Sequence, residues 1–367
     1  MNTFTNEDLG YTNFFEMGRM ESGLGMYSVA RVISESRGGY RVKNEQGEYI
    51  GRVTGKHVFE ATSREAYPAV GDWVAVSEPK DGHVLIHGIL PRMSMLKRTY
   101  GEKNRKGEKD KTQIIAANID VAFVIESVDR DYNLNRFERY FAIAHNSGVR
   151  PAIILNKVDL LSAEHLDERL VELRARFPDV DILTTSTVRM GGLDTLTAYL
   201  HTGKTYCFLG SSGVGKSSLI NALLGEAVTK TGAIGTHSGR GKHVTTARHM
   251  YFLKHGGIVI DNPGVREVGM ADVKHGIDTF FEDITARAID CAYSDCSHTH
   301  EPNCAVVQAV NMGTLSREKY NNYVSLKKET AYAEMNDLQK KDKDRQFGKF
   351  LKKAKKELGD AGYEDFR

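Results

Sequence analysis

The chain has 367 residues, which is too long for one ordinary domain and suits two or three. Apolar residues make up 40% and charged residues 27%, as in folded globular proteins, and a formal net charge of +2 is no general sign of a nucleic-acid-binding protein. The first 25 residues lack the apolar core of a signal peptide, and no apolar run is long enough to span a membrane, so we expect a cytoplasmic protein without a membrane partner.

The N-terminal part of the chain divides at about residue 26. Residues 1–25 are polar with interspersed Phe and Tyr, and we expect them to form a loose arm. In residues 26–112, short alternating runs such as YSVARVISE and DWVAVSE are separated by Gly, Asp and Asn, without a helix-length stretch. This pattern predicts a small antiparallel β-barrel. We expect Trp73, the only tryptophan, in the barrel core; stacking on a nucleic-acid base is the alternative.

A different pattern occupies residues 113–275. Strand-like apolar runs, for example at 119–128 and 151–156, alternate with helical stretches such as 134–148. Strands that are apolar throughout and separated by helices indicate an α/β domain with a parallel sheet covered on both faces. Two further segments complete the predicted multidomain chain: a zinc-binding α domain at 276–332 and a basic helical tail at 333–367.

A phosphate-binding loop lies inside the α/β region. The sequence GSSGVGKS follows an apolar strand and precedes an amphipathic helix, which is the context of a P-loop. Its backbone amides and the helix N-terminus would surround phosphates, the lysine would reach the β- and γ-phosphates, and Ser217 would coordinate magnesium. We expect the nucleotide phosphates to contact Gly210, Ser211, Ser212, Gly213, Val214, Gly215, Lys216, Ser217 and Ser218.

A second motif indicates which base is bound. Asn156, Lys157, Val158 and Asp159 follow an apolar strand, at the end where α/β sheets bind ligands. The Asp159 carboxylate would accept two hydrogen bonds from guanine, which adenine does not offer. Ser186 and Thr187 fit the second loop beside the base, where a backbone amide would meet the guanine oxygen. The sequence therefore predicts binding of GTP and GDP.

The sequence Asp-Asn-Pro-Gly follows the apolar run GGIVI. We expect Asp261 to hold magnesium together with Ser217, and the Gly264 amide to bind the γ-phosphate. Many GTPases place next a glutamine that orients the attacking water, whereas this chain has Val265. The water therefore needs another partner.

The glycine-rich segment 235–246 has the composition of a switch loop. Thr245 or Thr246 would complete the magnesium shell when the γ-phosphate is present. His243 is the candidate for positioning the water in catalysis; the alternative is that it only touches phosphate or RNA.

The order of these motifs is unusual. Common GTPases have the P-loop first, then the switch, Asp-x-x-Gly and Asn-Lys-x-Asp, whereas here the guanine-binding motif precedes the P-loop. The same sheet can form from a cut and rejoined chain when the original ends lie close together. The sequence therefore predicts a circularly permuted GTPase.

A Cys/His cluster follows the GTPase motifs. Cys291, Cys296, His298 and Cys304 offer three thiolates and an imidazole, a closed ligand set for one structural zinc ion. His300 is a rival for His298.

Together, the permuted order, GSSGVGKSS, DNPG, RGKHVTT and CAYSDCSHTHEPNCAV resemble the ribosome small-subunit-dependent GTPase A family (RsgA, also called YjeQ), over residues 26–328. The resemblance implies an N-terminal OB-fold, a permuted GTPase and a zinc domain, with hydrolysis stimulated by the small ribosomal subunit during its late maturation. It also implies that His243 is catalytic. The family has three threonines after this histidine, but Val244 replaces the first here, and we favour Thr246 as the magnesium ligand.

The resemblance names the expected partners: the small ribosomal subunit with its rRNA, and GTP with Mg²⁺. RNA contact is an open expectation for residues 97–111 and for the tail, which are locally basic. We expect a monomer. Two other functions remain: a GTP-gated binding module whose hydrolysis is incidental, and a metabolic P-loop kinase, which the guanine motif disfavours.

Overall fold

The computed structural model describes residues 4–36, 39–55, 61, 63–99, 112–129, 132–225, 248–254, 256–261, 273–335, 339–346 and 348–349. The chain forms two compact units. The first consists of Met1–Gly269 and His275–Glu282, and the second of Met270–Lys274 and Asp283–Arg367.

Five strands of the first unit close into a barrel. They are β1 (Ser28–Ser36), β2 (Gly39–Asn44), β3 (Gly47–Val53), β4 (Trp73–Val76) and β5 (His83–Ile89), with a short 3-10 helix η1 (Arg64–Ala66) before β4. The strand order is β1-β2-β3-β5-β4, and pairing of β1 with β4 closes the ring. The β3–β5 pair is parallel and the other pairs are antiparallel. Alternate side chains from four of the strands fill the interior, and the predicted OB-fold is confirmed.

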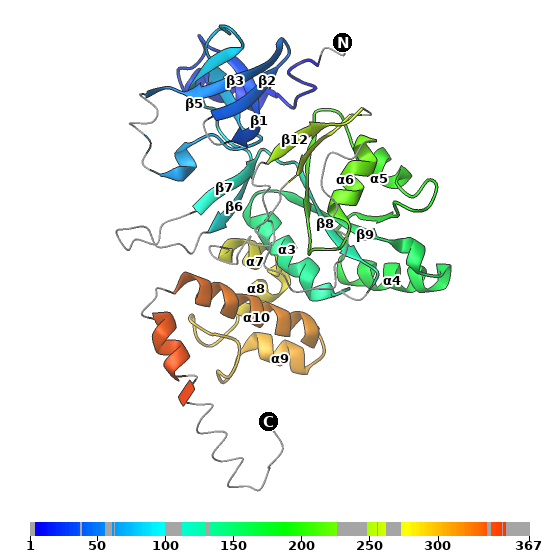
Figure 1. Cartoon of the computed structure of the whole chain (residues 1–367). Helices are drawn as coiled ribbons and strands as arrows, with labels where there is room; N and C mark the ends of the chain where they lie inside the picture. The colour runs from blue at the N-terminus through cyan, green and yellow to red at the C-terminus, as the bar shows by residue number, and fades with distance from the viewer. Residues whose placement is uncertain are drawn as a thin grey trace. The chain divides into compact units, whose positions relative to one another are not determined.

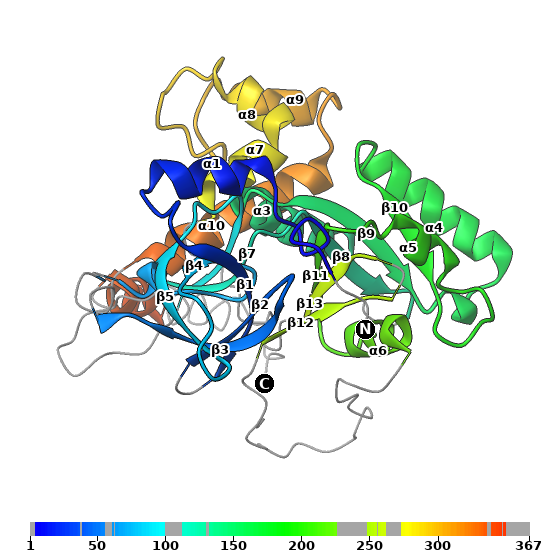
Figure 2. The ribbon, with the colours of Figure 1, turned by 90° about the horizontal axis from the view of Figure 1, so that it is seen from above.

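The N-terminal arm is folded, so the prediction of a loose arm was wrong. Helix α1 (Asn13–Glu21) lies beside the barrel strands in Figure 2. Leu9 and Phe15 are fully buried and pack against Trp73 and Leu90. Burial of these apolar side chains offsets the entropy lost when the arm becomes ordered. Trp73 is buried as predicted, but it packs with Leu9 and Phe15 of the arm and is not part of the apolar cluster inside the barrel, so its predicted place in the barrel core was wrong.

The predicted α/β sheet follows, with strands in the order β10-β9-β8-β11-β13-β12. Its strands are β8 (Val121–Ser127), β9 (Arg150–Asn156), β10 (Ile182–Thr185), β11 (Thr205–Leu209), β12 (His249–Phe252) and β13 (Ile258–Asp261). The accompanying helices are α3 (Leu134–Asn146), η2 (Val158–Leu160), α4 (Ala163–Arg176), α5 (Asp194–Tyr199), α6 (Lys216–Leu224) and α7 (Lys274–Phe280). All pairs are parallel except β12–β13, and the sequence analysis did not predict β12.

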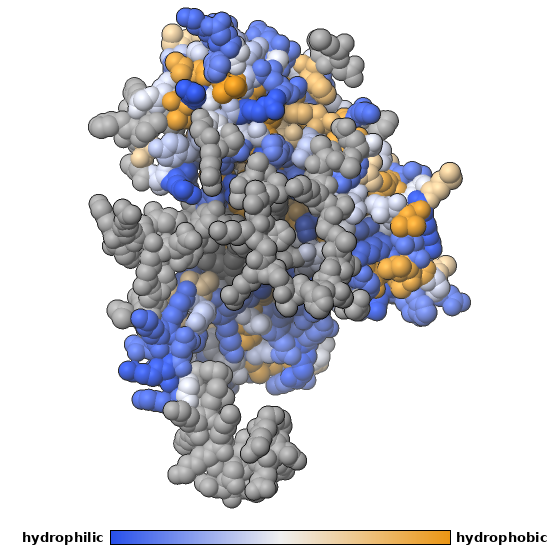
Figure 3. Space-filling view, in the orientation of Figure 1, coloured by the Kyte–Doolittle hydropathy of each residue, from blue (hydrophilic) through white to orange (hydrophobic). Residues whose placement is uncertain are grey.

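Both faces of this sheet are covered, which explains why β8 is buried along its whole length. On one face Phe123 packs with Leu196 of α5 and Leu219 of α6. Helix α3 contributes an aromatic cluster in which Phe141 meets Phe177 and Phe280 of α7. On the face seen in Figure 3, apolar residues of the described segments are scattered among hydrophilic ones, as expected when most apolar surface faces a core.

The barrel and the α/β sheet are continuous. Strand β1 pairs with β12 at Ser34 and His249, and Figure 1 shows β12 next to β1. The strands form one 11-stranded sheet, whose members are all labelled in Figure 2. A two-stranded sheet of β6 (Met95–Thr99) and β7 (Thr112–Ala117) links the two parts along the chain. Arg248, just before β12, also hydrogen-bonds Glu35 of β1 at 3.5 Å.

The second unit is helical. It contains α9 (Ala305–Asn311), α10 (Arg317–Glu334) and all but the first residue of α8 (Glu282–Ala288). The hydroxyl of Ser316 accepts a hydrogen bond from the Lys319 amide and so caps α10. None of the helices in the described part of the chain is long and apolar enough to cross a membrane.

Candidate functional site

The P-loop connects β11 to α6 at the carboxyl edge of the sheet. Gly210, Gly213 and Gly215 all have positive φ, which side chains disfavour. A Cβ atom on Gly215 would lie 2.2 Å from Nδ2 of Asn156, so only glycine fits where the two motifs meet. The Lys216 ammonium hydrogen-bonds the carbonyls of Gly210 and Ser211 at 2.7 and 2.6 Å, which places it over the loop.

The two predicted base-binding loops meet each other and the P-loop. Asn156, at the end of β9, donates from its side chain to the Val214 carbonyl at 2.7 Å and accepts from the Thr185 hydroxyl at 2.9 Å. The Ser186 hydroxyl donates to Asp159 at 2.6 Å and accepts from the amides of Val188 and Arg189. Parallel strands end at one edge of the sheet, and this is why motifs far apart in the sequence lie together.

Lys157 takes a left-handed conformation with φ of 61°. Its ammonium forms an ion pair with Asp129 at 2.8 Å, and Asp129 in turn accepts from the Ser127 hydroxyl at 2.6 Å. The bend at Lys157 turns the chain into η2, which contains Val158 and Asp159. Thr187 follows Ser186 after β10.

The predicted magnesium ligands are described only in part. Ser217 lies in the first turn of α6 and Asp261 ends β13. Burial raises the pKa of the Asp261 carboxyl, while the nearby charges of His249 and Lys216 oppose this shift. A hydroxyl and a carboxylate are oxygen ligands suited to Mg²⁺. Gly264, His243, Thr246 and Val265 lie outside the described residues.

Three contacts of this site were not predicted. Thr185 and Asp129 support Asn156 and Lys157, and both stand at or just beyond the ends of buried strands, which is the signal that would have found them. The Tyr140 hydroxyl on α3 lies close to the Ser211 side chain, which opposes the rise that burial causes in the pKa of Tyr140. Tyr140 belongs to the apolar face of its helix, so the sequence pattern gave no sign of this contact.

The four predicted metal ligands are brought together. The ligand atoms of Cys291, Cys296, His298 and Cys304 all lie within 4.8 Å of one another. Sγ of Cys291 is 3.8 Å from Sγ of Cys304, and both sulfurs are 3.5 Å from Nδ1 of His298. Zn–S bonds of about 2.3 Å in a tetrahedron imply sulfur separations of about 3.8 Å, so this group fits a tetrahedral ion.

Neighbouring residues hold this group in place. The carbonyl of His298 accepts from the Tyr320 hydroxyl of α10 at 2.6 Å, and the Cys304 sulfur accepts from the Val307 amide at the start of α9. His300 lies outside the group, and its Nδ1 contacts the Thr299 hydroxyl. His298, and not His300, therefore lies together with the three cysteines.

The fold and the nucleotide-binding motifs together define a circularly permuted P-loop GTPase. A family model described as RsgA GTPase matches residues 89–271. A second model, described as ABC transporter, matches residues 193–354, a range that includes the P-loop shared by ATP- and GTP-binding proteins.

Individual relatives agree with the first model. "Small ribosomal subunit biogenesis GTPase RsgA 2" of Lactiplantibacillus plantarum is 42% identical over 85% of this chain and 86% of its own length. The crystal structure of YjeQ from Thermotoga maritima aligns with a TM-score of 0.61 at 25% identity, over 82% of this chain and 97% of that one. YloQ, described as a circularly permuted GTPase, shares the fold with a TM-score of 0.58 at 21% identity, over 84% of this chain and 97% of that one. The chain belongs to the RsgA GTPase family and is a GTP-hydrolysing enzyme.

Proposed function

We propose that this GTPase acts in the biogenesis of the small ribosomal subunit and that the subunit stimulates its hydrolysis of GTP to GDP and phosphate. The observation that carries the proposal is that Asn156 of the first base-side loop bonds Val214 of the P-loop, while Ser186 of the second base-side loop bonds Asp159 of the first. The names of relatives that match most of the chain support the ribosomal role.

The guanine base is assigned to the loops after β9 and β10. Ser186 holds one carboxylate oxygen of Asp159 and leaves the other for the guanine ring NH and amine. We assign GTP binding to Asn156, Lys157, Val158, Asp159, Ser186, Thr187, the P-loop residues 210–218 and Gly264.

The hydrolytic step needs a positioned water. Ser217, Thr246 and Asp261 are the proposed protein ligands of Mg²⁺, which neutralises charge on the phosphates when bound. His243 is the proposed residue that orients the water, since Val265 has no polar group. Lys216 would exchange its loop carbonyls for phosphate oxygens.

The remaining assignments concern zinc and RNA. We assign a structural zinc ion to the Cys₃His group, because its sulfur and nitrogen separations suit zinc. The barrel is a candidate for rRNA contact, because OB-folds present one face and its loops to nucleic acid. The domain limits at 26–112, 113–275 and 276–332, the monomeric state and the cytoplasmic location remain predictions.

The test is GTP turnover by the full chain with and without purified small ribosomal subunits, with large subunits as the matched control. We expect acceleration by small subunits alone. Tight binding of small subunits without acceleration would support the GTP-gated binding module instead. Equal rates with and without subunits, and no binding, would reject the ribosomal role.

A further inference from the structure

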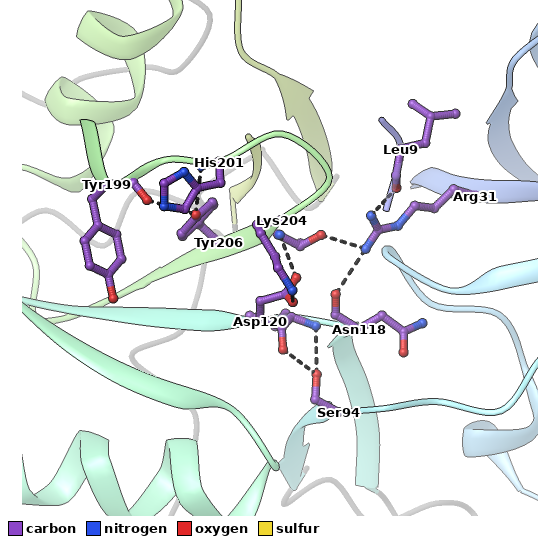
Figure 4. Close-up of polar contacts among 11 residues, drawn as sticks. Leu9, Arg31, Ser94, Asn118, Asp120, Tyr199, His201, Lys204 and Tyr206 are labelled. Atoms are coloured by element: carbon purple, nitrogen blue, oxygen red, sulfur yellow. Dashed lines mark hydrogen bonds and ion pairs between the residues drawn. The ribbon is translucent and has the colours of Figure 1, made fainter. Parts of the chain in front are cut away.

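Arg31 of β1 is a buried cation at the junction of four segments. Its side chain is 1% exposed and reaches out of the barrel wall, as Figure 4 shows. The guanidinium donates to the carbonyls of Leu9 in the arm, Gly71 before β4 and Asn118 after β7. It also donates to the Thr205 hydroxyl, on the first residue of β11, at 2.8 Å.

Burial and hydrogen bonding together fix the position of this guanidinium. Burial lowers the pKa of Arg31 to about 10, so the group stays charged at neutral pH. Asp120 and Asp72 act on it only as nearby charges, and the described residues place no carboxylate in hydrogen-bonding contact with it. A buried cation needs all of its polar partners, because each unmade hydrogen bond costs desolvation free energy.

Thr205 connects the Arg31 guanidinium to the GTPase sheet. The Thr205 amide donates to the Asp120 carboxylate, and its carbonyl accepts from the Asp120 amide, both at 2.8 Å. Strand β11 then runs from Thr205 to Leu209 in the centre of the sheet and ends directly at the P-loop. Among the described residues, the Arg31–Thr205 hydrogen bond directly joins a barrel strand to β11.

The backbone around the junction is closely packed. A Cβ atom on Gly71 would lie 2.0 Å from the Ala117 carbonyl, and one on Gly203 would lie 2.7 Å from the Glu7 carbonyl. Both positions lack space for any side chain. A close-packed contact of this kind transmits small displacements instead of absorbing them.

We propose that Arg31 is a positioning residue that couples the barrel to the P-loop. Binding of ribosomal RNA at the barrel shifts β1, and the Arg31–Thr205 hydrogen bond and β11 pass that shift to the phosphate site. This inference rests on the proposed function, because it concerns how the subunit regulates hydrolysis. The coupling concerns the rate of hydrolysis, for which thermodynamic reciprocity with RNA affinity is not required.

The test compares Thr205→Val, which keeps the shape and removes the hydroxyl, with Thr205→Ser, which keeps the hydroxyl. Ser147→Ala is the matched control, because its buried hydroxyl bonds only the Ile143 carbonyl within α3 and the turn after it. The kcat and KM for GTP are measured with and without small subunits, together with the Kd for GDP. Circular dichroism checks folding, and Arg31→Lys is the second variant if Thr205→Val does not fold.

We expect Thr205→Val to lose about fivefold or more of the subunit-stimulated kcat, at the lower end of the range for coupled sites, with basal kcat and GDP affinity within about twofold of the parent. Thr205→Ser and Ser147→Ala should behave as the parent. Full stimulation of Thr205→Val, a parallel fall in basal and stimulated rates, or failure of Thr205→Ser to restore stimulation would overturn the inference. Absence of stimulation in the parent chain would instead reject the proposed function.

Discussion

The two compact units differ in the interactions that stabilise each of them internally. The first has a continuous sheet with large apolar clusters on both sides, and most of its strands have hydrogen-bonded neighbours on each side. The second unit has one long helix, α10 with 18 residues, whereas α8 and α9 have only seven residues each. Helices of this length are unstable in isolation. Its Cys₃His group joins the loop at 291–304 to the start of α9, so a zinc ion bound there would cross-link these short segments.

The largest expected effect is therefore loss of the second unit on removal of zinc. Apparent zinc-binding free energies of about 10–16 kcal/mol in small zinc modules exceed the stability of most domains. Chelation, or His298→Gln, should unfold this unit and leave GDP binding by the first unit nearly unchanged. His300→Gln is the matched control and should keep one zinc per chain. Metal analysis and GDP titration on the same samples check this; zinc in the His298→Gln protein would count against the ligand assignment.

A substitution in the core of the first unit should lower the stability of that unit and leave the second unit unaffected. Phe15→Ala removes a side chain that is 1% exposed and packs near Trp73, so it should cost the first unit about 3–5 kcal/mol. Phe14→Ala removes the neighbouring ring, which is 39% exposed, and should cost much less. Denaturant unfolding followed by Trp73 fluorescence measures the first unit, while zinc content should stay the same in both variants. Equal unfolding midpoints would show that the arm adds nothing to the core.

A third substitution should weaken nucleotide binding by the first unit without lowering the stability of that unit. Asp159→Asn should weaken GDP binding by about 2 kcal/mol, because the amide cannot accept both guanine hydrogen bonds. Affinity for xanthosine diphosphate should rise, since xanthine has an oxygen where guanine has the amine. Titration calorimetry checks both, with the exposed Asp167→Asn on α4 as the control. Unchanged GDP affinity would remove Asp159 from the guanine site.

Much of this architecture could be predicted because the signals are local. β8 begins with five apolar residues and α3 has helical spacing, and both lie where the patterns predict. Glycines of the P-loop and the Cys/His spacing are equally local. These local signals are the basis for the residues that we propose to contact phosphate, base and metal.

The predictions failed where contacts between residues far apart in the sequence determine burial or strand formation. The arm reads as polar, yet Leu9 and Phe15 are buried because Trp73 and Leu90 provide an apolar surface for them. The sequence pattern of β1 is compatible with an exposed Arg31 and gives no sign that this residue is buried. Its burial depends on carbonyls from three distant segments. The four residues of β12 are too few to show a period, and pairing with β13 and β1 makes them a strand.

The smallest expected effect concerns pH and again separates the two units. Burial lowers the pKa of His145, whose ring lies 6.1 Å from that of Phe280. The unfolded chain therefore binds this proton more tightly than the folded chain, and stability present above the ordinary histidine pKa of about 6.5 is lost as the pH falls through that value. His145→Gln should make unfolding of the first unit less dependent on pH between 7.5 and 5.5. His165→Gln on α4 is the control, because it replaces a histidine whose side chain is exposed. Denaturant midpoints by Trp73 fluorescence decide it: identical slopes for His145→Gln and the parent would mean that the imidazole is protonated as readily inside the fold as outside it.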